Sequence, residues 1–167
     1  MLNKERLLTH IDIIVSQSDL EGTITYANPI FYRVAGYKYG ELIGKNHNII
    51  RHPDMPKVIF KLLWEQLKRG EEVYCFIKNR AKDRGFYWVF AYIRPSFNKD
   101  KTVRNYISTR RIISSRARDI IEPLYRELLD IEKIDGVLSS EKVFRDFIEQ
   151  NSYGAKSINE VICNIQY

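Results

Sequence analysis

Three long runs rich in β-branched and aromatic residues follow one another closely in the middle of the sequence. They are residues 72–80, 86–95 and 103–113, and the charged segments 81–85 and 98–101 connect them. Runs of this composition, bounded by polar residues, are typical of β-strands. The charged segments between them read as turns, so the sequence predicts three successive strands of one sheet.

The residues before this sheet add two strands and insert helices. Residues 11–16 and 23–27 predict a hairpin, because Gly22 in the turn between them can adopt a positive φ. Residues 55–69 carry apolar side chains with a 3.6-residue period, which predicts a helix that Gly70 ends. The expected fold class is α+β, a five-stranded antiparallel sheet with helices between the second and third strands.

Both ends of the chain are expected to be helical. Residues 1–10 read as a helical lead-in to a central domain over residues 11–115. In a tail over residues 116–167, two stretches, 118–134 and 139–149, place apolar side chains at helical spacing. These amphipathic helices need a surface to cover, and the sequence leaves open whether it is the sheet or a partner.

The composition predicts a cytoplasmic protein that does not insert into a membrane. No run approaches the roughly 18 consecutive apolar residues of a membrane-spanning helix, and residues 1–6 mix acid and base instead of leading into an apolar signal core. Cys75 and Cys163 lie far apart, with no second thiol or histidine at metal-binding spacing. Such cysteine usage suits a reducing compartment and no metal site.

The formal net charge of +6 is concentrated in two runs, residues 78–84 and 110–118. A basic strip can bind nucleic acid, but neither run carries the interleaved aromatics and glycines of an RNA-binding sheet. We interpret both runs as solvated turns or the polar edge of a sheet, and we expect no nucleic-acid partner.

The sequence shows no arrangement of residues for catalysis. It has no glycine-rich phosphate loop and suggests no Ser-His-Asp or Cys-His set. His47 and His52 are not four residues apart, as a zinc pair on one helix face would be. We therefore expect a protein that is not an enzyme and that signals by contact.

One segment carries a specific resemblance. Residues 44–56, Gly-Lys-Asn-His-Asn-Ile-Ile-Arg-His-Pro-Asp-Met-Pro, resemble the signature segment of aerotaxis-receptor (Aer-type) PAS domains. Further blocks agree with it: Ile24–Asn28, Ala35–Tyr37, Glu41–Gly44, Lys78–Arg80, Tyr87–Val89 and Glu122–Tyr125. The resemblance covers about residues 16–125. It implies a PAS fold and a sensor of cellular redox state that binds FAD.

The resemblance also implies which residues hold the flavin. The flavin-binding positions of the family correspond to Asn28, Arg51, His52 and Asp54, and all four match. An isoalloxazine ring needs an apolar slot for its faces and a few donors for its carbonyl groups. Asn28 would supply an amide, Arg51 would stabilise negative charge on the reduced ring or a phosphate, and His52 and Asp54 would orient the ring or relay protons. In the alternative reading, Arg51 and Asp54 pair and brace a loop.

One position departs from the family and other ligands remain open. Val73 stands where Aer-type domains carry a flavin-contacting Trp. Light-sensing LOV domains place a reactive Cys where this chain has His47, which argues against blue-light photochemistry. His47 would instead serve as axial ligand if the cofactor were haem b. A third reading is a cofactor-free interaction module whose pocket is filled by its own side chains.

The resemblance further suggests how the protein signals. Aer-type receptors carry membrane and chemoreceptor domains in the same chain, and this sequence lacks them. We expect a stand-alone bacterial energy-taxis sensor that contacts a separate membrane-bound chemoreceptor. Contact elements would be the outer face of residues 86–113 and the tail. PAS domains commonly dimerise, and the lead-in would then pack across a two-fold axis.

Overall fold

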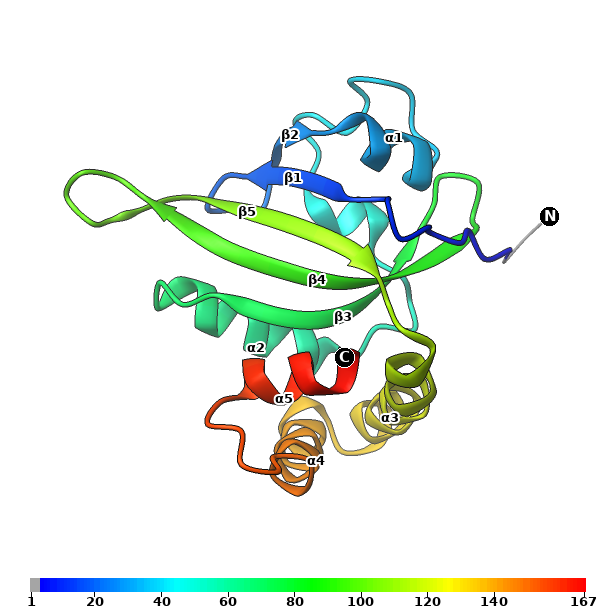
Figure 1. Ribbon diagram of the computed structural model, residues 1–167, viewed down its shortest axis with the longest axis vertical. Coiled ribbons are helices and arrows are strands. Elements are labelled where there is room, and N and C mark those ends of the chain that lie inside the picture. The colour runs from blue at the N-terminus through cyan, green and yellow to red at the C-terminus, as the bar shows by residue number, and fades with distance from the viewer. Residues whose placement is uncertain (1–3) are drawn as a thin grey trace.

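Five strands form a single antiparallel sheet in the computed structural model, which describes residues 4–167. The strands are β1 (Ile14–Ser18), β2 (Ile24–Ala27), β3 (Val73–Arg80), β4 (Phe86–Phe97) and β5 (Val103–Ile112). Their order across the sheet is β2-β1-β5-β4-β3, with every neighbouring pair antiparallel (Figure 1). The predicted sheet and α+β fold class are confirmed.

The helices between β2 and β3 are α1 (Pro29–Ala35), the short 3-10 helix η1 (His47–Ile50) and α2 (Lys57–Lys68). Asn28 caps α1 by accepting a hydrogen bond from the amide of Phe31, and Gly36 ends the helix at φ 74°. Residues of α1, α2 and the sheet share one apolar core, which includes Phe31, Val58 and Leu67. The predicted insertion of helices between the second and third strands is confirmed.

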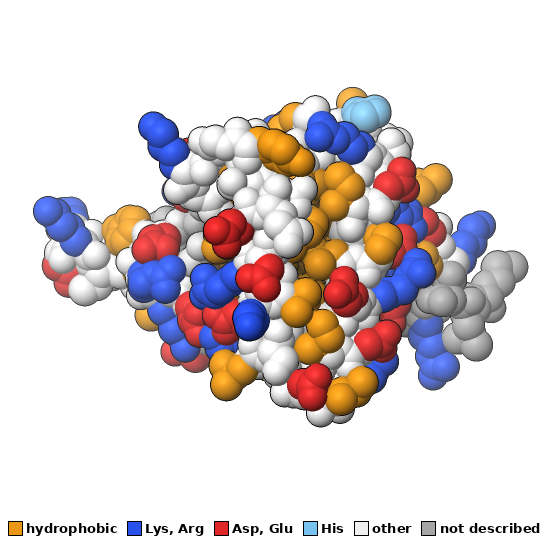
Figure 2. Space-filling view, turned by 90° about the horizontal axis from the view of Figure 1, so that it is seen from below, with side chains coloured by type: hydrophobic (Ala, Val, Ile, Leu, Met, Phe, Trp, Pro, Cys, Tyr) orange, Lys and Arg blue, Asp and Glu red, His pale blue; other side chains and the backbone are white. Residues whose placement is uncertain are grey.

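Three helices follow the sheet: α3 (Ser115–Ile134), α4 (Val137–Gln150) and α5 (Ile158–Gln166). They gather beside β3 and leave the β2 side of the sheet free (Figure 1). Their apolar residues join the core, among them Leu128, Phe144 and Ile162. The sequence left open whether these helices cover the sheet or a partner. In the structure they cover the sheet and α2. On the side seen in Figure 2, acidic and basic side chains alternate with apolar ones.

The start of the chain corrects the expectation of a helix over residues 1–10. Residues 4–10 are not helical. The amide of Arg6 donates to the carbonyl of Phe86 over 2.7 Å, and the amide of Phe86 donates to the carbonyl of Lys4 over 3.0 Å. The Arg6 guanidinium also donates to Asp83 over 2.7 Å. These long-range bonds hold the segment extended beside the start of β4. Residues 1–3 lie outside the described part of the chain.

Other parts of the chain cover the edge strand β3. Along β3, Asn159 of α5 accepts from the amide of Tyr74 and donates to the carbonyl of Glu72, each over 2.9 Å. The Tyr125 hydroxyl of α3 donates to the carbonyl of Phe76 over 2.7 Å. An uncovered edge strand is a template for pairing with other chains, so these contacts protect β3.

No helix within residues 4–167 has the length and apolar character to cross a bilayer.

Candidate ligand-binding cavity

A cavity of about 210 Å³ lies between the sheet, η1 and α2. Its apolar wall comes mainly from α2 and η1, with Phe60, Leu63 and Trp64 among the lining residues. Its polar lining comes mainly from the sheet and the residues beside η1: Ser16, Ser18, Asn46, His47, Asn48, Arg51, Asn79, Ser108 and Arg110, with Glu21 from the turn before β2 as its acidic member. An apolar pocket with a few convergent polar groups is the usual form of a small-molecule site.

Residues 44–56, here called the crossing segment, run across the cavity from one edge of the sheet to the other. At the β2 edge, the amide of Ile24 donates to the carbonyl of Lys45 over 2.8 Å. At the β3 edge, Arg51 forms an isolated antiparallel bridge with Asn79, and the Lys78 amide donates to the sulfur of Met55 over 3.2 Å. Fixed at both edges, the segment holds His47 and Arg51 against the cavity.

Arg110 of β5 is the most unusual residue of this cavity. It is 3% exposed, and burial lowers the pKa of its guanidinium to about 10. It donates to the hydroxyl of Ser16 and lies 4.5 Å from the centre of the Phe31 ring. Within the described residues no carboxylate pairs with it. A buried cation without a counterion is costly, so the cavity favours a ligand that is negative or rich in carbonyl oxygens.

Two buried donors in this lining have no partner. Among the residues that the structure describes, neither Nε of Arg110 nor Nδ2 of Asn79 makes a hydrogen bond. Leaving a buried donor unpaired costs about 1–3 kcal/mol, and such exceptions in a native fold call for an explanation. A ligand that offers acceptor atoms to both of these residues would satisfy the two donors.

His47 adds a neutral polar group beside Arg110. Its Nε2 lies 3.2 Å from the Ser16 hydroxyl, and its ring stacks on Phe31 with centroids 6.0 Å apart. Burial, together with the positive charge of Arg110, lowers the pKa of His47 to about 3. The imidazole is therefore uncharged at neutral pH and adds no second cation to the cavity.

The predicted site residues do not all lie in this cavity. Arg51 lines it, with its guanidinium 4.4 Å from the centre of the Phe60 ring. Asn28 instead joins β1 to α1. Its side chain accepts from the amides of Val15 (3.0 Å) and Phe31 (3.1 Å) and donates to the carbonyl of Ile13 (2.8 Å). These three bonds use most of its hydrogen-bonding capacity.

His52 and Asp54 lie at the end of the crossing segment beside β3 and are not part of the cavity lining. The Asp54 amide donates to Nδ1 of His52 over 3.1 Å, and Lys78 donates to the Asp54 carboxylate over 2.6 Å. Arg51 and Asp54 form no ion pair; Lys78 is the basic partner of Asp54. Although burial opposes it, the Lys78 ammonium lowers the pKa of Asp54. The arrangement braces the loop that leads into α2.

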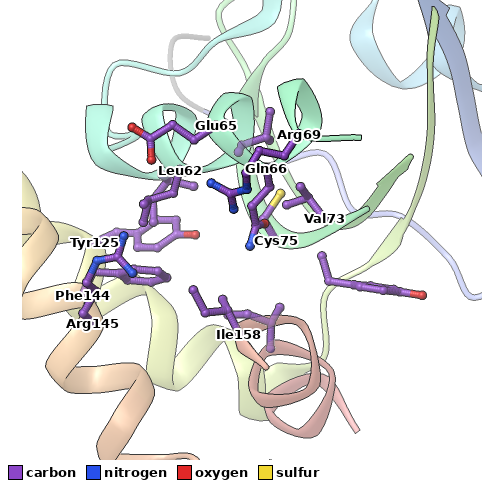
Figure 3. A pocket seen from close by; sticks show the side chains of 14 residues that line it. Leu62, Glu65, Gln66, Arg69, Val73, Cys75, Tyr125, Phe144, Arg145 and Ile158 are labelled. Carbon is purple, nitrogen blue, oxygen red and sulfur yellow. The ribbon is translucent and has the colours of Figure 1, made fainter. Parts of the chain in front are cut away.

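Val73 lines a second, smaller cavity of about 70 Å³ between α2, β3 and the C-terminal helices (Figure 3). Cys75 lies in the same lining, and burial raises the pKa of its thiol to about 12, so the thiolate that would react is scarce at neutral pH. The aromatic wall of the larger cavity comes instead from Trp64 and Tyr106, whose rings meet edge to face at 5.6 Å.

Arg110 and Asn79 are cavity residues that the sequence does not predict. Arg110 was counted in a basic run interpreted as solvated, whereas it is buried. Strand alternation held the signal, because Tyr106, Ser108 and Arg110 share one face of β5 and all three are buried. Asn79 lies within the other basic run, residues 78–84, and is 3% exposed.

Comparison with known proteins agrees with this fold. The family model described as "PAS fold" matches residues 24–110. The aerotaxis receptor of Escherichia coli is 41% identical over 115 residues, which are 69% of this chain and 22% of that protein. The nitrogen fixation regulatory protein of Klebsiella pneumoniae is 29% identical over 108 residues, 65% of this chain and again 22% of the relative. The chain thus spans about a fifth of each of these two relatives.

Solved structures show the same architecture at low sequence identity. A light-oxygen-voltage domain studied with a flavin analogue has a TM-score of 0.58 and 23% identity, covering 65% of this chain and 82% of that one. The LOV domain of the Erythrobacter litoralis blue-light-activated histidine kinase has a TM-score of 0.55 and 18% identity, covering 60% and 94%. These two likenesses concern the fold alone.

Proposed function

The chain belongs to the PAS fold family and contains an Aer-type PAS domain, and from this premise we propose that it is a redox sensor that binds FAD in the cavity under the crossing segment. The observation that carries the proposal is the pair of unpaired buried donors, Arg110 Nε and Asn79 Nδ2. The pyrimidine side of a flavin ring offers carbonyl and nitrogen acceptors that suit such donors.

The residues present fit a flavin. Trp64, Tyr106 and Phe60 supply apolar walls, while Arg110 and Asn79 supply donors, and Arg51 supplies a second guanidinium. The cavity of about 210 Å³ is below the roughly 300–1,000 Å³ of sites that enclose whole drug-sized ligands. It therefore suits the ring system, with the remainder of FAD outside. When bound, the flavin would supply the redox chemistry, and Arg110 would favour a more negative ring.

The remaining predicted residues take supporting roles in this proposal. Asn28 fixes β1 against α1, and His52 and Asp54 hold the end of the crossing segment, so that Arg51 keeps its place. Val73, at the position of the family Trp, lines the smaller cavity, so in this proposal Trp64 supplies the aromatic surface beside the ring.

The visible spectrum of the purified protein, before and after reconstitution with FAD, tests the proposal. We expect flavin absorption in the blue. Arg110→Met should weaken FAD binding by at least about tenfold, because a buried charged hydrogen bond contributes about 1.5–3 kcal/mol. The matched control is Arg111→Met, since Arg111 is its exposed neighbour. Absence of flavin from wild-type protein after reconstitution would refute the proposal.

Haem b is the second candidate, because His47 lines the cavity and is neutral, as an axial ligand must be. The same spectrum separates the two, since haem gives a Soret band. Its loss in His47→Ala would assign haem. A spectrum without either chromophore would favour a cofactor-free interaction module.

We propose that the output is protein contact with a separate membrane-bound chemoreceptor in energy taxis, from a cytoplasmic location. The outer face of β4 and β5 offers partly buried Tyr92 and Ile107 and the exposed cations Arg94 and Arg111 as contacts. A homodimer through this face competes with such a partner. Light scattering of the purified protein measures the dimer, and co-sedimentation with membranes that contain chemoreceptors measures the partner contact.

A further inference from the structure

Helix α2 is a wall shared by the ligand cavity and the C-terminal helices. Phe60, Trp64 and Leu67 of α2 line the larger cavity. Leu62 and Gln66, on another side of the same helix, line the smaller cavity beside α4 and α5. Leu63 lines both cavities. A displacement of α2 by a ligand therefore reaches the C-terminal helices directly.

The first turn of α2 is capped by a residue from a distant helix. Pro56 precedes α2 and makes no side-chain cap. Glu132 of α3 takes this role: its two carboxylate oxygens accept from the amides of Lys57 and Val58, each over 2.9 Å. Ser140 of α4 donates to the same carboxylate over 3.2 Å. A carboxylate at this end also suits the helix dipole.

A second polar contact lies one turn further along α2. Lys61 donates to Glu141 of α4 over 2.8 Å and to Glu65 of its own helix over 2.6 Å. Between this contact and β3, the helices leave the cavity of about 70 Å³. Figure 3 shows Leu62, Gln66 and Arg69 of α2 on one side of it, with Phe144 and Ile158 on the other. Protein interiors are normally close-packed. Because the contact between α2 and the C-terminal helices includes this cavity, the stability of this contact depends more on the polar contacts of Glu132 and Lys61.

Helix α2 also begins where the crossing segment ends, six residues after Arg51. Cavity, crossing segment, first turn of α2 and Glu132 thus form one continuous series of contacts. We propose that Glu132 is a positioning residue that couples the ligand cavity to the docking of α3, α4 and α5. Filling the cavity fixes α2 with its first turn on Glu132 and strengthens docking of the C-terminal helices, and by reciprocity their docking strengthens ligand binding.

This inference rests on the proposed flavin site, and hydrogen exchange with and without FAD tests it. In the wild type we expect FAD to slow amide exchange in α4, which packs against α2, and in α5, which is bonded to the cavity strand β3 through Asn159. In Glu132→Ala this ligand effect should be lost, and the FAD dissociation constant should rise about three- to tenfold, the range of a lost N-cap. Glu132→Gln keeps one acceptor and should restore part of both effects.

Glu127→Ala is the matched control, because Glu127 is exposed on the same helix and should leave both readouts unchanged. If Glu132→Ala speeds exchange equally with and without FAD, Glu132 is only a structural cap and the coupling is refuted. If wild-type protein binds no FAD, the proposed function fails instead. The ligand-free Glu132→Ala variant then tests the series of contacts on its own. If amide exchange in its crossing segment is the same as in ligand-free wild-type protein, the coupling through Glu132 is refuted as well.

Discussion

Arg110 is expected to be solvated from the sequence but is buried in the structure. In the sequence it belongs to a dense basic run, and most such runs are solvated. In β5, Arg110 and Arg111 point to opposite faces of the sheet. Arg111 is exposed, whereas Arg110 is only 3% exposed and lies beside Ser16 and His47. Their charge does not distinguish the buried arginine from the exposed one, whereas the alternation of side chains between the two faces of β5 does.

The unpaired charge of Arg110 predicts a stability effect opposite to its effect on binding. Arg110→Met should leave the ligand-free protein as stable as the wild type or more stable, because it removes a buried guanidinium that no carboxylate pairs. Urea unfolding without ligand measures this. A loss of more than about 2 kcal/mol in ligand-free protein would show that Arg110 holds the core together and does not serve a ligand.

His47 predicts a pH dependence of stability. Its pKa falls from the model-peptide 6.5 to about 3 in the folded chain, so below pH 6.5 the unfolded chain binds a proton that the folded chain does not. Stability then decreases as pH falls from about 6.5 towards 3, by up to about 1.4 kcal/mol per unit. Arg110 and Ser16 face this imidazole.

Urea unfolding at pH 7, 6 and 5 checks this. The wild type should lose stability over this range, and His47→Asn should lose clearly less. Equal slopes for the two proteins would mean that His47 is solvated in the folded chain. The carboxylates of Asp12 and Asp83, whose pKa values are lowered through their hydrogen bonds, contribute mainly at lower pH.

At the scale of elements, the edge strand β3 depends on Asn159. Its amide pairs with both the N–H of Tyr74 and the carbonyl of Glu72, in place of a sixth strand. We expect Asn159→Ala to destabilise the protein by about 1–2 kcal/mol, because two hydrogen bonds are lost. The exposed edge should also increase self-association.

Urea unfolding and light scattering measure the two effects, with Gln150→Ala as control because Gln150 is an exposed amide at the end of α4. If Asn159→Ala behaves like this control, the contacts of Tyr125, Met55 and Arg51 are enough to protect the β3 edge.

The elements that the sequence predicted best are those with strong local patterns. Helix α2 and the three later strands follow from periodicity and from turns such as Gly70, and the structure confirms them. The helix over residues 1–10 failed because Lys4 and Arg6 pair with Phe86, eighty residues away. Likewise, nothing near Pro56 in the sequence indicates that Glu132 caps α2.

At the scale of the whole molecule, the C-terminal helices are part of the hydrophobic core. Trp88 and Phe90 of β4 are 4% and 5% exposed, and their rings contact Tyr125 and Tyr167. A chain ending at Ser114 should therefore expose a large apolar surface and aggregate or oligomerise. Size-exclusion chromatography with light scattering checks this. A monomeric, cooperatively folding truncation would show that the PAS domain is complete without these helices.

The family resemblance singled out the crossing segment, but it could not show which of its side chains line the cavity. Of the five residues predicted to hold the cofactor, Arg51 lines the larger cavity and Val73 the smaller one. The other three are used in bonds that hold strands and loops together. Such assignments depend on packing between segments far apart in the sequence, which local patterns do not encode.

The two unpaired donors of the cavity have a consequence for the protein in the cell. The unpaired donors destabilise the folded chain when the cavity is empty, and a ligand that pairs with them removes this cost. Because a ligand that binds only the folded chain stabilises it by mass action, the folded fraction depends on ligand supply. Newly made chains without ligand would unfold more often and be removed by proteases. If FAD is the ligand of this cavity, as proposed above, the abundance of this protein should therefore follow the availability of FAD.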